Sequence, residues 1–272
     1  MLNYHNFPLY WTQFKGECNL KIHPNDELCK PVKASQSEFN DVKDLFESTY
    51  IASLVGKGLD ATNINTTSVS VTNVERIEKV ELWHDYIHAR DKIIRKILKR
   101  GPFKKLESIS NCIRGPVNTS TKKHKTLNRE IYPEMNEYYL FHGTKSDIVG
   151  NLIDKGLDPR HSGDKTMMGR GIYCAEVSIK SDQYADDKNN RRTIGLTILL
   201  VRMVLGNIYV ATKPKQFKMP PCTTCLTDRC TNESHEHFDS VVADIPNKLF
   251  REFIVYDGTQ CYPEYLITYN RY

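Results

Sequence analysis

The chain has 272 residues, of which 39% are hydrophobic, 26% charged and 10% aromatic. This composition is that of an ordinary globular protein and excludes a collagen, a low-complexity disordered chain and a coiled coil. The formal net charge of +5 at pH 7 is too mild over this length to indicate a nucleic-acid partner by itself. The length allows one large domain or two small ones, with a core that needs no disulfide framework.

The start of the chain indicates no targeting segment. Residues 1–5 lack the basic and apolar regions of a signal peptide. No run approaches the roughly 18 apolar residues that a membrane span needs. The eight cysteines are too sparse for a disulfide scaffold. We therefore expect a soluble protein of the cytoplasm or nucleus with reduced thiols.

The first half of the chain begins with an unpatterned segment and continues with two helices. Residues 1–36 mix aromatic and polar side chains without a clear period and are interpreted as a lead-in segment. From Ser37, a candidate N-cap, apolar residues at helical spacing predict an amphipathic helix as far as Tyr50. Residues 63–82 suit a strand that leads into a long helix through Leu98, and the sequence Arg100-Gly101-Pro102 ends that helix.

Positive charge is concentrated in one part of the chain. Between Arg76 and Arg129 there are 15 Lys and Arg against 5 Asp and Glu, so this segment carries +10 and the rest of the chain carries −5. The basic helix and loop from Lys92 to Arg129 have two interpretations. One is a solvated helix face with a surface loop, which is the usual behaviour of charge runs; the other is a contact for a polyanion or an acceptor protein.

In the second half, short strands follow one another with few helices between them. Strands are predicted at 138–141, 172–174, 193–204, 250–256 and 265–269, and short helices around 148–153 and 178–185. The strand at 193–204 is almost entirely apolar, as a strand buried on both faces should be. This pattern predicts an α+β fold rather than a doubly wound parallel sheet.

Glu252 is the most informative single residue. The period of two in its predicted strand places it on the same face as Phe250 and Ile254. A carboxylate on an apolar face costs free energy unless it is paired or used, so Glu252 is a functional candidate. The alternative is an exposed glutamate at a sheet edge. Glu264 has no comparable setting in the sequence.

Other candidate residues have weaker individual signals. His142 ends a predicted strand and precedes Gly143, which lets a ligand approach the backbone closely. Ser181 and Tyr184 lie three residues apart in a predicted helix, so a hydroxyl and a ring share one face. Together they can bind a planar amide by a hydrogen bond and by stacking. Taken alone, the motif at His142 is a weak signal, and Ser181, Tyr184 and Tyr173 are more typical of packing than of a binding site.

Five segments together resemble one known family. They are His142-Gly143-Thr144, Gly169-Arg170-Gly171-Ile172-Tyr173, Ser181-Asp182-Gln183-Tyr184, Arg251-Glu252-Phe253-Ile254-Val255-Tyr256 and the stretch Tyr-Pro-Glu-Tyr-Leu-Ile-Thr-Tyr at 262–269. In order and spacing they resemble the catalytic domain of the poly(ADP-ribose) polymerases. Residues 157–161 and 262–269 are most similar to the tankyrase branch. The resemblance implies an ADP-ribosyltransferase-like α+β fold of two packed, antiparallel-rich sheets with flanking helices, and it places the catalytic domain at 37–272.

The resemblance also implies an NAD+ site of the His-Tyr-Glu type. In such a site His142 would bind a ribose hydroxyl, and Gly143 and Ser181 would hold the nicotinamide amide. Tyr184 would stack on the nicotinamide ring, and Tyr173 would wall its other side. The residues implied at the NAD+ site, with His142, Tyr173 and Glu252 as the catalytic set, are His142, Gly143, Thr144, Asp158, Arg160, His161, Gly171, Tyr173, Ser181, Tyr184 and Glu252.

The implied activity is NAD+-dependent ADP-ribosyl transfer to proteins. Cleavage of the bond between nicotinamide and ribose builds oxocarbenium character, which a carboxylate such as Glu252 stabilises by polarising a ribose hydroxyl. Chain-elongating members keep a Glu where many single-transfer members have an apolar residue, so Glu252 favours chain elongation. Single transfer is the alternative, and automodification is one outcome for either.

Two functions of other classes stay open. One is a catalytically silent fold that binds NAD+ or ADP-ribose, against which the retention of His142, Tyr173 and Glu252 argues. The other is a zinc-dependent nucleic-acid-binding protein that uses the basic segment; it predicts steeply salt-dependent binding.

A group of cysteines and histidines predicts a zinc site. Cys222 and Cys225 are separated by two residues, and Cys230 follows them, so that three thiolates with either His235 or His237 can complete a tetrahedron around one metal. Tankyrases carry a zinc motif in the stretch that aligns with 186–192, which here contains no Cys or His. The zinc prediction therefore depends on spacing alone, and free thiols in a loop are the alternative.

Overall fold

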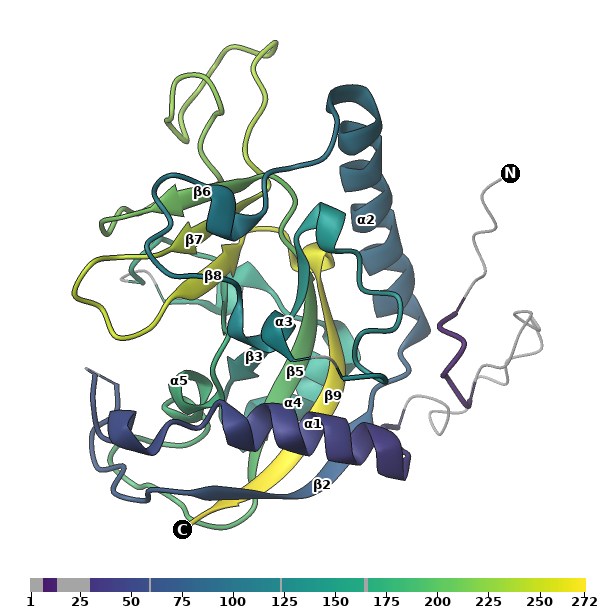
Figure 1. Cartoon of the computed structure of the whole chain (residues 1–272), viewed down its shortest axis with the longest axis vertical. Coiled ribbons are helices and arrows are strands. Elements are labelled where there is room, and N and C mark those ends of the chain that lie inside the picture. Colours follow the sequence, from purple (N-terminus) through teal and green to yellow (C-terminus); the bar gives the residue numbers. More distant parts are fainter. Residues whose placement is uncertain (1–6, 14–29, 59, 123, 164–165) are drawn as a thin grey trace.

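The computed structural model describes residues 7–13, 30–58, 60–122, 124–163 and 166–272 (Figure 1). In chain order its elements are β1 (Val32–Lys33), α1 (Gln36–Ser48), η2 (Ala52–Leu54), β2 (Val69–Arg76), α2 (Val80–Arg100), η3 (Leu106–Ser108), α3 (Asn118–Thr121), η4 (Pro133–Met135), β3 (Glu137–Gly143), α4 (Ser146–Lys155), η5 (Pro159–His161), β4 (Ile172–Ala175), α5 (Ser178–Asp182), β5 (Leu196–Val204), β6 (Ile208–Ala211), β7 (Ser240–Ala243), β8 (Glu252–Val255), η6 (Gly258–Gln260) and β9 (Cys261–Arg271).

One sheet with the strand order β1-β2-β9-β5-β3-β4-β8-β7-β6 organises these elements. Its neighbouring strands are antiparallel except for β6 and β7. The predicted α+β class is confirmed, whereas the predicted pair of packed sheets is not, because backbone pairing joins all nine strands. β3 and β4 are joined at a single residue pair, Phe141 with Ala175, so the sheet narrows to one link near its middle.

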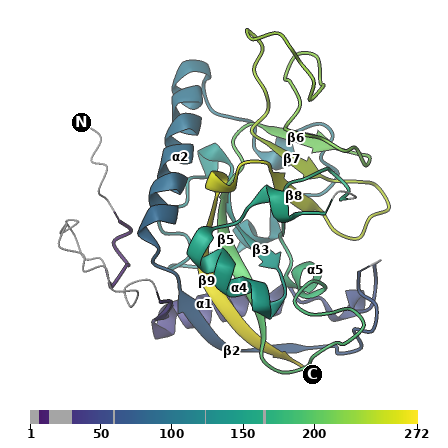
Figure 2. The same cartoon turned by 180° about the vertical axis from the view of Figure 1, so that it is seen from behind.

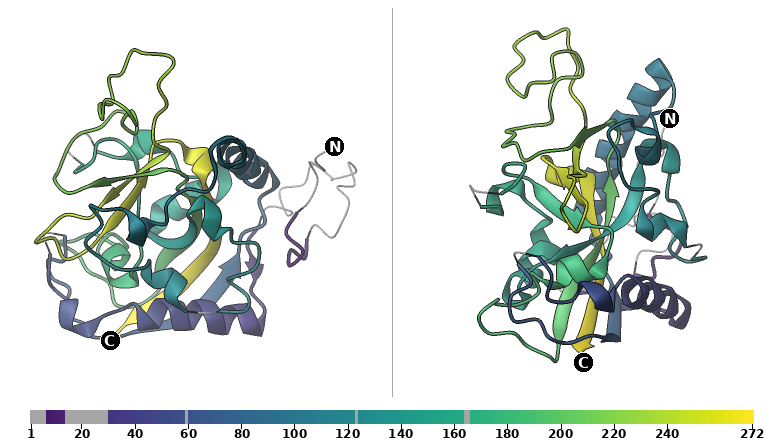
Figure 3. Two further views of the ribbon diagram at one scale, coloured as in Figure 1. Left: turned by 45° about the horizontal axis from the view of Figure 1, so that its top comes forward. Right: turned by 60° about the vertical axis from the view of Figure 1, so that its left-hand side comes forward.

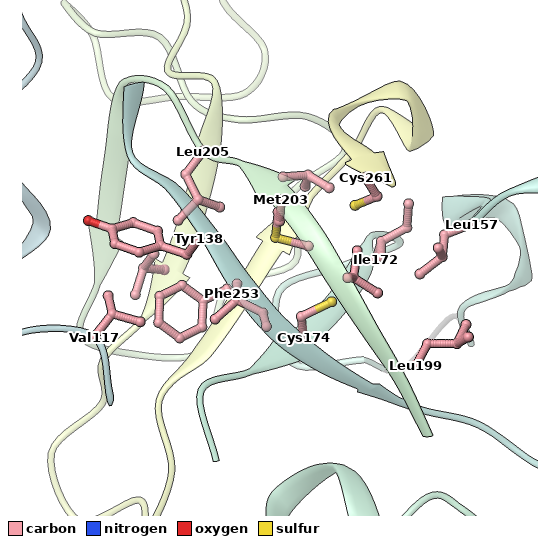
Figure 4. Close-up of a cluster of buried hydrophobic side chains, with 14 of the residues drawn as sticks. Val117, Tyr138, Leu157, Ile172, Cys174, Leu199, Met203, Leu205, Phe253 and Cys261 are labelled. Atoms are coloured by element: carbon pink, nitrogen blue, oxygen red, sulfur yellow. The ribbon is translucent and has the colours of Figure 1, made fainter. Parts of the chain in front are cut away.

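Buried apolar side chains hold the two sides of this link together. The cluster in Figure 4 draws residues from strands on both sides of it, and these side chains are almost inaccessible to solvent. Their burial is the main force that fixes β4 and β8 relative to β3 and β5. The labelled members on these strands are Tyr138, Ile172, Cys174, Leu199, Met203 and Phe253.

Helix α1 is capped two residues earlier than predicted. Ser35, not Ser37, is the N-cap: its hydroxyl accepts a hydrogen bond from the Glu38 backbone at 3.4 Å. The Glu38 carboxylate in turn accepts from the Ser35 backbone N–H at 2.9 Å, which completes a capping box. The same carboxylate accepts from Arg76 of β2, so the cap also ties α1 to the sheet. Figures 1 and 2 show α1 and α4 on opposite faces of that sheet.

Helix α2 packs against a part of the lead-in segment. Trp83 and Tyr86 on its buried face contact Tyr262 of β9, and they form one cluster with Phe7 and Trp11. Phe7 and Trp11 of the lead-in segment are therefore part of the core, although the sequence of this segment shows no period, whereas Leu9 between them is exposed. Residues 1–6 and 14–29 lie outside the described part. No helix in the described ranges has the length and apolar character to cross a membrane.

Ion pairs to other parts of the chain use much of the charge in the basic segment. Among the described residues of this segment, seven Lys and Arg side chains contact carboxylates that lie outside 76–129. These seven side chains are therefore neither free to bind a polyanion nor simply solvated. The pairs are Arg76 with Glu38, Lys79 with Asp154, Arg90 with Glu137, Lys96 with Asp239, Arg100 with Glu236, Arg114 with Asp244, and Lys122 with Asp44.

Candidate active site

Several of the predicted site residues gather where β3, β4 and β8 meet. Phe141 of β3 pairs with Ala175 of β4, and Ala175 pairs on its other side with Glu252 of β8. Beyond this row β3 continues along β5 as far as Gly143, while β4 continues along β8. His142 and Gly143 therefore lie at the edge where β3 parts from β4.

His142 is tied to β4 by one ring nitrogen. Its Nδ1 lies 2.9 Å from the carbonyl oxygen of Tyr173, so a neutral ring donates from Nδ1 and leaves Nε2 as an acceptor. Burial lowers the pKa of His142, although the hydrogen bond to Tyr173 opposes this shift, and the neutral ring is favoured near pH 7. Nε2 makes no hydrogen bond to any described residue, so it is available to a ligand hydroxyl.

Gly143 permits the close contact between β3 and α5. A Cβ atom at this position would lie 1.9 Å from the carbonyl oxygen of Ser181, a distance that no side chain tolerates. Ser181 is buried, and its hydroxyl donates to the carbonyl of Phe141 at 2.9 Å. These contacts place α5 against the end of β3. The Ser181 oxygen can still accept a hydrogen bond from a ligand.

Tyr173 is held at its hydroxyl. The oxygen accepts from the backbone N–H of Met168 and donates to the carbonyl of Gly169, each over 2.8 Å. Burial raises the pKa of Tyr173, so the phenol keeps its proton. The ring is thus fixed against the loop that precedes β4. Gly171, in the same loop, lies against Ile254 of β8.

Glu252 forms an ion pair that no pattern in the sequence indicates. Lys180 Nζ lies 3.0 Å from Glu252 Oε1, and the two side chains are only 11% and 14% exposed. Burial opposes the charge on Lys180, but the Glu252 carboxylate outweighs it and raises the pKa of Lys180 above its ordinary value. The other carboxylate oxygen of Glu252 accepts no hydrogen bond from the described residues. An inward-facing lysine has no periodic signal, because most lysines are exposed.

The same lysine joins Glu252 to Tyr184 and Asp60. Lys180 Nζ donates to the Tyr184 hydroxyl at 2.8 Å and lies 3.4 Å from Asp60 Oδ2. The Tyr184 hydroxyl donates to that same Asp60 oxygen at 2.5 Å. Burial raises the pKa of Tyr184 to about 12. Since the hydroxyl is held and the residue is 41% exposed, part of the ring remains accessible.

The predicted donor-loop residues are not brought into contact with this group. Arg160 is paired with Asp158 at 2.6 Å, and its hydrogen bonds lower the pKa of Asp158 to about 2. His161 ends the short helix η5 after them. Thr144 directly follows β3.

Glu264 is buried, contrary to its unremarkable setting in the sequence. Its carboxylate accepts hydrogen bonds from Arg202 at 2.7 Å and from Tyr139 at 2.8 Å, and also from Tyr10 of the lead-in segment. Because all of these contacts are satisfied within the core, Glu264 serves the fold.

The connection between β6 and β7 gathers four of the predicted metal ligands. One donor atom from each of Cys222, Cys225, Cys230 and His235 lies within 4.8 Å of the others. His237 is directed elsewhere, since its Nδ1 lies 2.6 Å from the carbonyl oxygen of Pro220. Burial opposes ionisation of the Cys222 thiol, but hydrogen bonds from the backbone of Cys225 and Thr224 outweigh this and lower its pKa to about 6.

Comparison with known proteins identifies the domain family. The family described as poly(ADP-ribose) polymerase catalytic domain matches residues 37–271. Protein mono-ADP-ribosyltransferase PARP11 is 24% identical over 241 residues in Mus musculus (82% of this chain, 57% of the relative) and 23% identical over 257 residues in Homo sapiens (88% and 58%). Protein mono-ADP-ribosyltransferase PARP14 of Homo sapiens is 23% identical over 273 residues, which are 98% of this chain and 11% of the relative.

These relatives do not support the predictions of a tankyrase branch and of chain elongation. The chain spans less than two thirds of the length of each of them. All are named as mono-ADP-ribosyltransferases, so they support neither the predicted tankyrase branch nor the predicted chain elongation. The expected enzyme class is confirmed at the level of the domain family. Because the family match covers most of the chain, this chain belongs to the poly(ADP-ribose) polymerase catalytic domain family of NAD+-dependent ADP-ribosyltransferases.

Proposed function

We propose that this chain transfers a single ADP-ribose unit from NAD+ to a protein acceptor. The observation that carries the proposal is the meeting of His142, Tyr173 and Glu252 at the junction of β3, β4 and β8. Nε2 of His142 and the second carboxylate oxygen of Glu252 are both unused by the described residues there. The names of the relatives favour single transfer over chain elongation.

The junction has groups suited to the nicotinamide end of NAD+. Pairing between β3 and β4 ends at Phe141, so no strand covers the backbone of Gly143 on that side, and its amide and carbonyl can bond a carboxamide. The Ser181 hydroxyl, which already donates to Phe141, would accept from the carboxamide nitrogen. The rings of Tyr173 and Tyr184, each held at its hydroxyl, would bound the nicotinamide plane.

The ribose end would lie against His142 and Glu252. NAD+ supplies the ADP-ribosyl group and a nicotinamide leaving group. Nicotinamide departs with the electron pair of the broken carbon–nitrogen bond, and the acceptor nucleophile forms the new bond at the same ribose carbon. Lys180 orients the Glu252 carboxylate through Oε1, and the other oxygen would accept from a ribose hydroxyl and stabilise the developing positive charge. Glu252 would then take the proton of the acceptor.

Labelling with NAD+ tests the proposal. The purified full chain is incubated with labelled NAD+ and candidate acceptor proteins, and the products are separated on a gel. A discrete labelled band is expected, and Glu252→Gln should reduce its rate of formation by roughly 100-fold or more because a charge-stabilising group is removed. The matched control is Glu134→Gln at an exposed glutamate, which should label normally.

The pattern of label separates the alternatives. A ladder that depends on Glu252 contradicts single transfer and favours chain elongation. Intact NAD+ with no labelled protein contradicts the transferase proposal and favours a silent binding fold.

A further inference from the structure

We propose that Cys222, Cys225, Cys230 and His235 bind one Zn²⁺ ion, which holds together the connection between β6 and β7. This connection, residues 212–239, is called the crossover segment below. The proposal is independent of the proposed function, because its evidence lies in the sulfur and nitrogen atoms of the loop and its test measures metal.

Residues 223–239 of the crossover segment need a source of stability that neither a helix nor the core provides. β6 and β7 are parallel, with Ile208 opposite Ser240 and Ala211 opposite Ala243, so the chain must return along the length of the strands. Such returns are usually helical, but residues 212–239 contain no helix. No residue from 223 through 239 is buried. In Figure 3 the segment projects well beyond the sheet.

The donor atoms have the spacing of a tetrahedral zinc site. Cys222 Sγ lies 3.6 Å and Cys230 Sγ 3.5 Å from Nδ1 of His235. Ordinary zinc bonds of about 2.3 Å to sulfur and about 2.0 Å to nitrogen place such atoms about 3.5 Å apart at a tetrahedral angle. All three cysteines are free of disulfides. Three thiolates and one imidazole form a closed set, which is typical of structural rather than catalytic zinc.

The local backbone is arranged around the sulfur of Cys222. The N–H groups of Thr224 and Cys225 point at this sulfur over 3.3 and 3.5 Å, and such donors stabilise a thiolate that binds metal. Leu226, directly after the second cysteine, has a φ of 54°. This left-handed conformation is costly for a leucine and persists only where the surroundings enforce it. A metal bound to the cysteines on either side of the turn would enforce it.

The first part of the crossover segment contacts the loop that holds Tyr173. The N–H groups of Lys215 and Phe217 donate to the carbonyls of Met167 and Met168, each over 3.2 Å. Gly169 has a φ of +84°, and a Cβ there would lie 2.0 Å from the carbonyl oxygen of Phe217. A zinc ion bound by the cysteines and His235 would hold the rest of the crossover segment. It would thereby also stabilise the contact between the first part of this segment and the loop of Tyr173.

Elemental analysis of the purified full chain tests the site. One zinc per chain is expected in the wild type, and most of it should be lost in Cys225→Ser and in His235→Gln. His237→Gln is the matched control, because this nearby histidine bonds Pro220 instead and its loss should leave zinc in place. A wild-type protein without zinc after growth in zinc-supplemented medium, or full zinc in Cys225→Ser, overturns the proposal.

A second measurement avoids dependence on variants that fail to fold. Wild-type protein loaded with Co²⁺ should show the thiolate-to-cobalt charge-transfer absorption and the visible bands of tetrahedral cobalt. Their absence overturns the site. Glu252→Gln should keep its zinc while losing transfer, so a failed metal site and a failed transferase give different results.

Discussion

At the scale of single residues, the candidate site depends on one inward-facing lysine with three partners. Lys180 contacts the carboxylates of Glu252 and Asp60 and the hydroxyl of Tyr184. It thereby couples the proposed catalytic carboxylate to the ring proposed to stack on nicotinamide. The proposed function then implies a division of roles, in which Glu252 would contact substrate, whereas Lys180 and Asp60 would position other groups.

Replacing Asp60 by asparagine tests this division. Asp60→Asn removes the charged acceptor of Tyr184 but leaves the pair of Lys180 with Glu252. Because Asp60 is half exposed, we expect KM for NAD+ to rise by roughly 3- to 10-fold with a smaller change in kcat. Steady-state kinetics measure both constants. Asp154→Asn, at an exposed aspartate paired with Lys79, is the control, and a fall in kcat at unchanged KM contradicts the positioning role.

At the scale of elements, side chains that cap and link decide where helices begin and how they attach. The capping box of α1 uses Ser35, and its partner Glu38 also binds Arg76 of β2. The α5 segment is likewise fixed by the contact of Gly143 with Ser181. Helix ends in this fold are therefore tied to strands directly, and a lost cap loosens more than one element.

Ser35→Ala tests the cap of α1. Loss of the hydroxyl leaves an N–H of the first turn without its acceptor, and the free energy of unfolding should fall by about 1 kcal/mol. Ser37→Ala, at the residue favoured by the sequence pattern but placed inside the helix, should leave the free energy of unfolding unchanged or raise it by a few tenths of a kcal/mol, because alanine has the higher helix propensity. Urea unfolding of both variants measures these changes. If Ser37→Ala lowers the free energy of unfolding as much as Ser35→Ala or more, Ser35 is not the N-cap.

At the scale of the whole molecule, long-range ion pairs join parts of the chain that carry opposite charge. The basic segment meets acidic residues of the remainder, and the last strand is tied to the end of α5 and to the residues that follow it. In that region Arg271 of β9 binds Asp182 and Asp186. The modest net charge is therefore the balance of two unlike parts that pair when the chain folds.

The contribution of Asp186 to the stability of the fold should decrease at acidic pH. Burial raises the pKa of Asp186, but hydrogen bonds from Arg271 and the Arg192 backbone outweigh it, so the pKa is lowered. The unfolded chain binds this proton first on acidification, so the stabilisation is complete above the ordinary aspartate value of about 3.9 and is lost as pH falls through the lower folded value. Asp186→Asn should cost about 3 kcal/mol near neutral pH.

The difference between wild type and Asp186→Asn should then shrink as pH falls below about 4. Urea unfolding across this range measures the difference directly. Glu134→Gln, at an exposed glutamate, should differ little from wild type throughout. A gap that stays constant with pH contradicts the assignment of this stabilisation to the ionised carboxylate.

The local pattern of the sequence was sufficient to recognise the family motifs, the α+β class and the longer strands. The strands around 138–141, 172–174 and 265–269 lie inside β3, β4 and β9, because alternation and runs of apolar residues are properties of neighbours in the chain. The short strands β6 and β7 escaped prediction, since four residues carry too little pattern. His142, Tyr173 and Glu252 are predicted as site residues because each lies in a contiguous motif.

Only the tertiary structure decided which of these groups touch. Asp60 and Tyr184 lie 124 positions apart, and no local pattern encodes such a contact, so neither Asp60 nor Lys180 was found from the sequence. The choice of His235 over His237 as the histidine facing the sulfurs also depends on how the crossover segment turns back. Spacing supplies the candidates for a site, whereas the path of the backbone between distant strands selects among them.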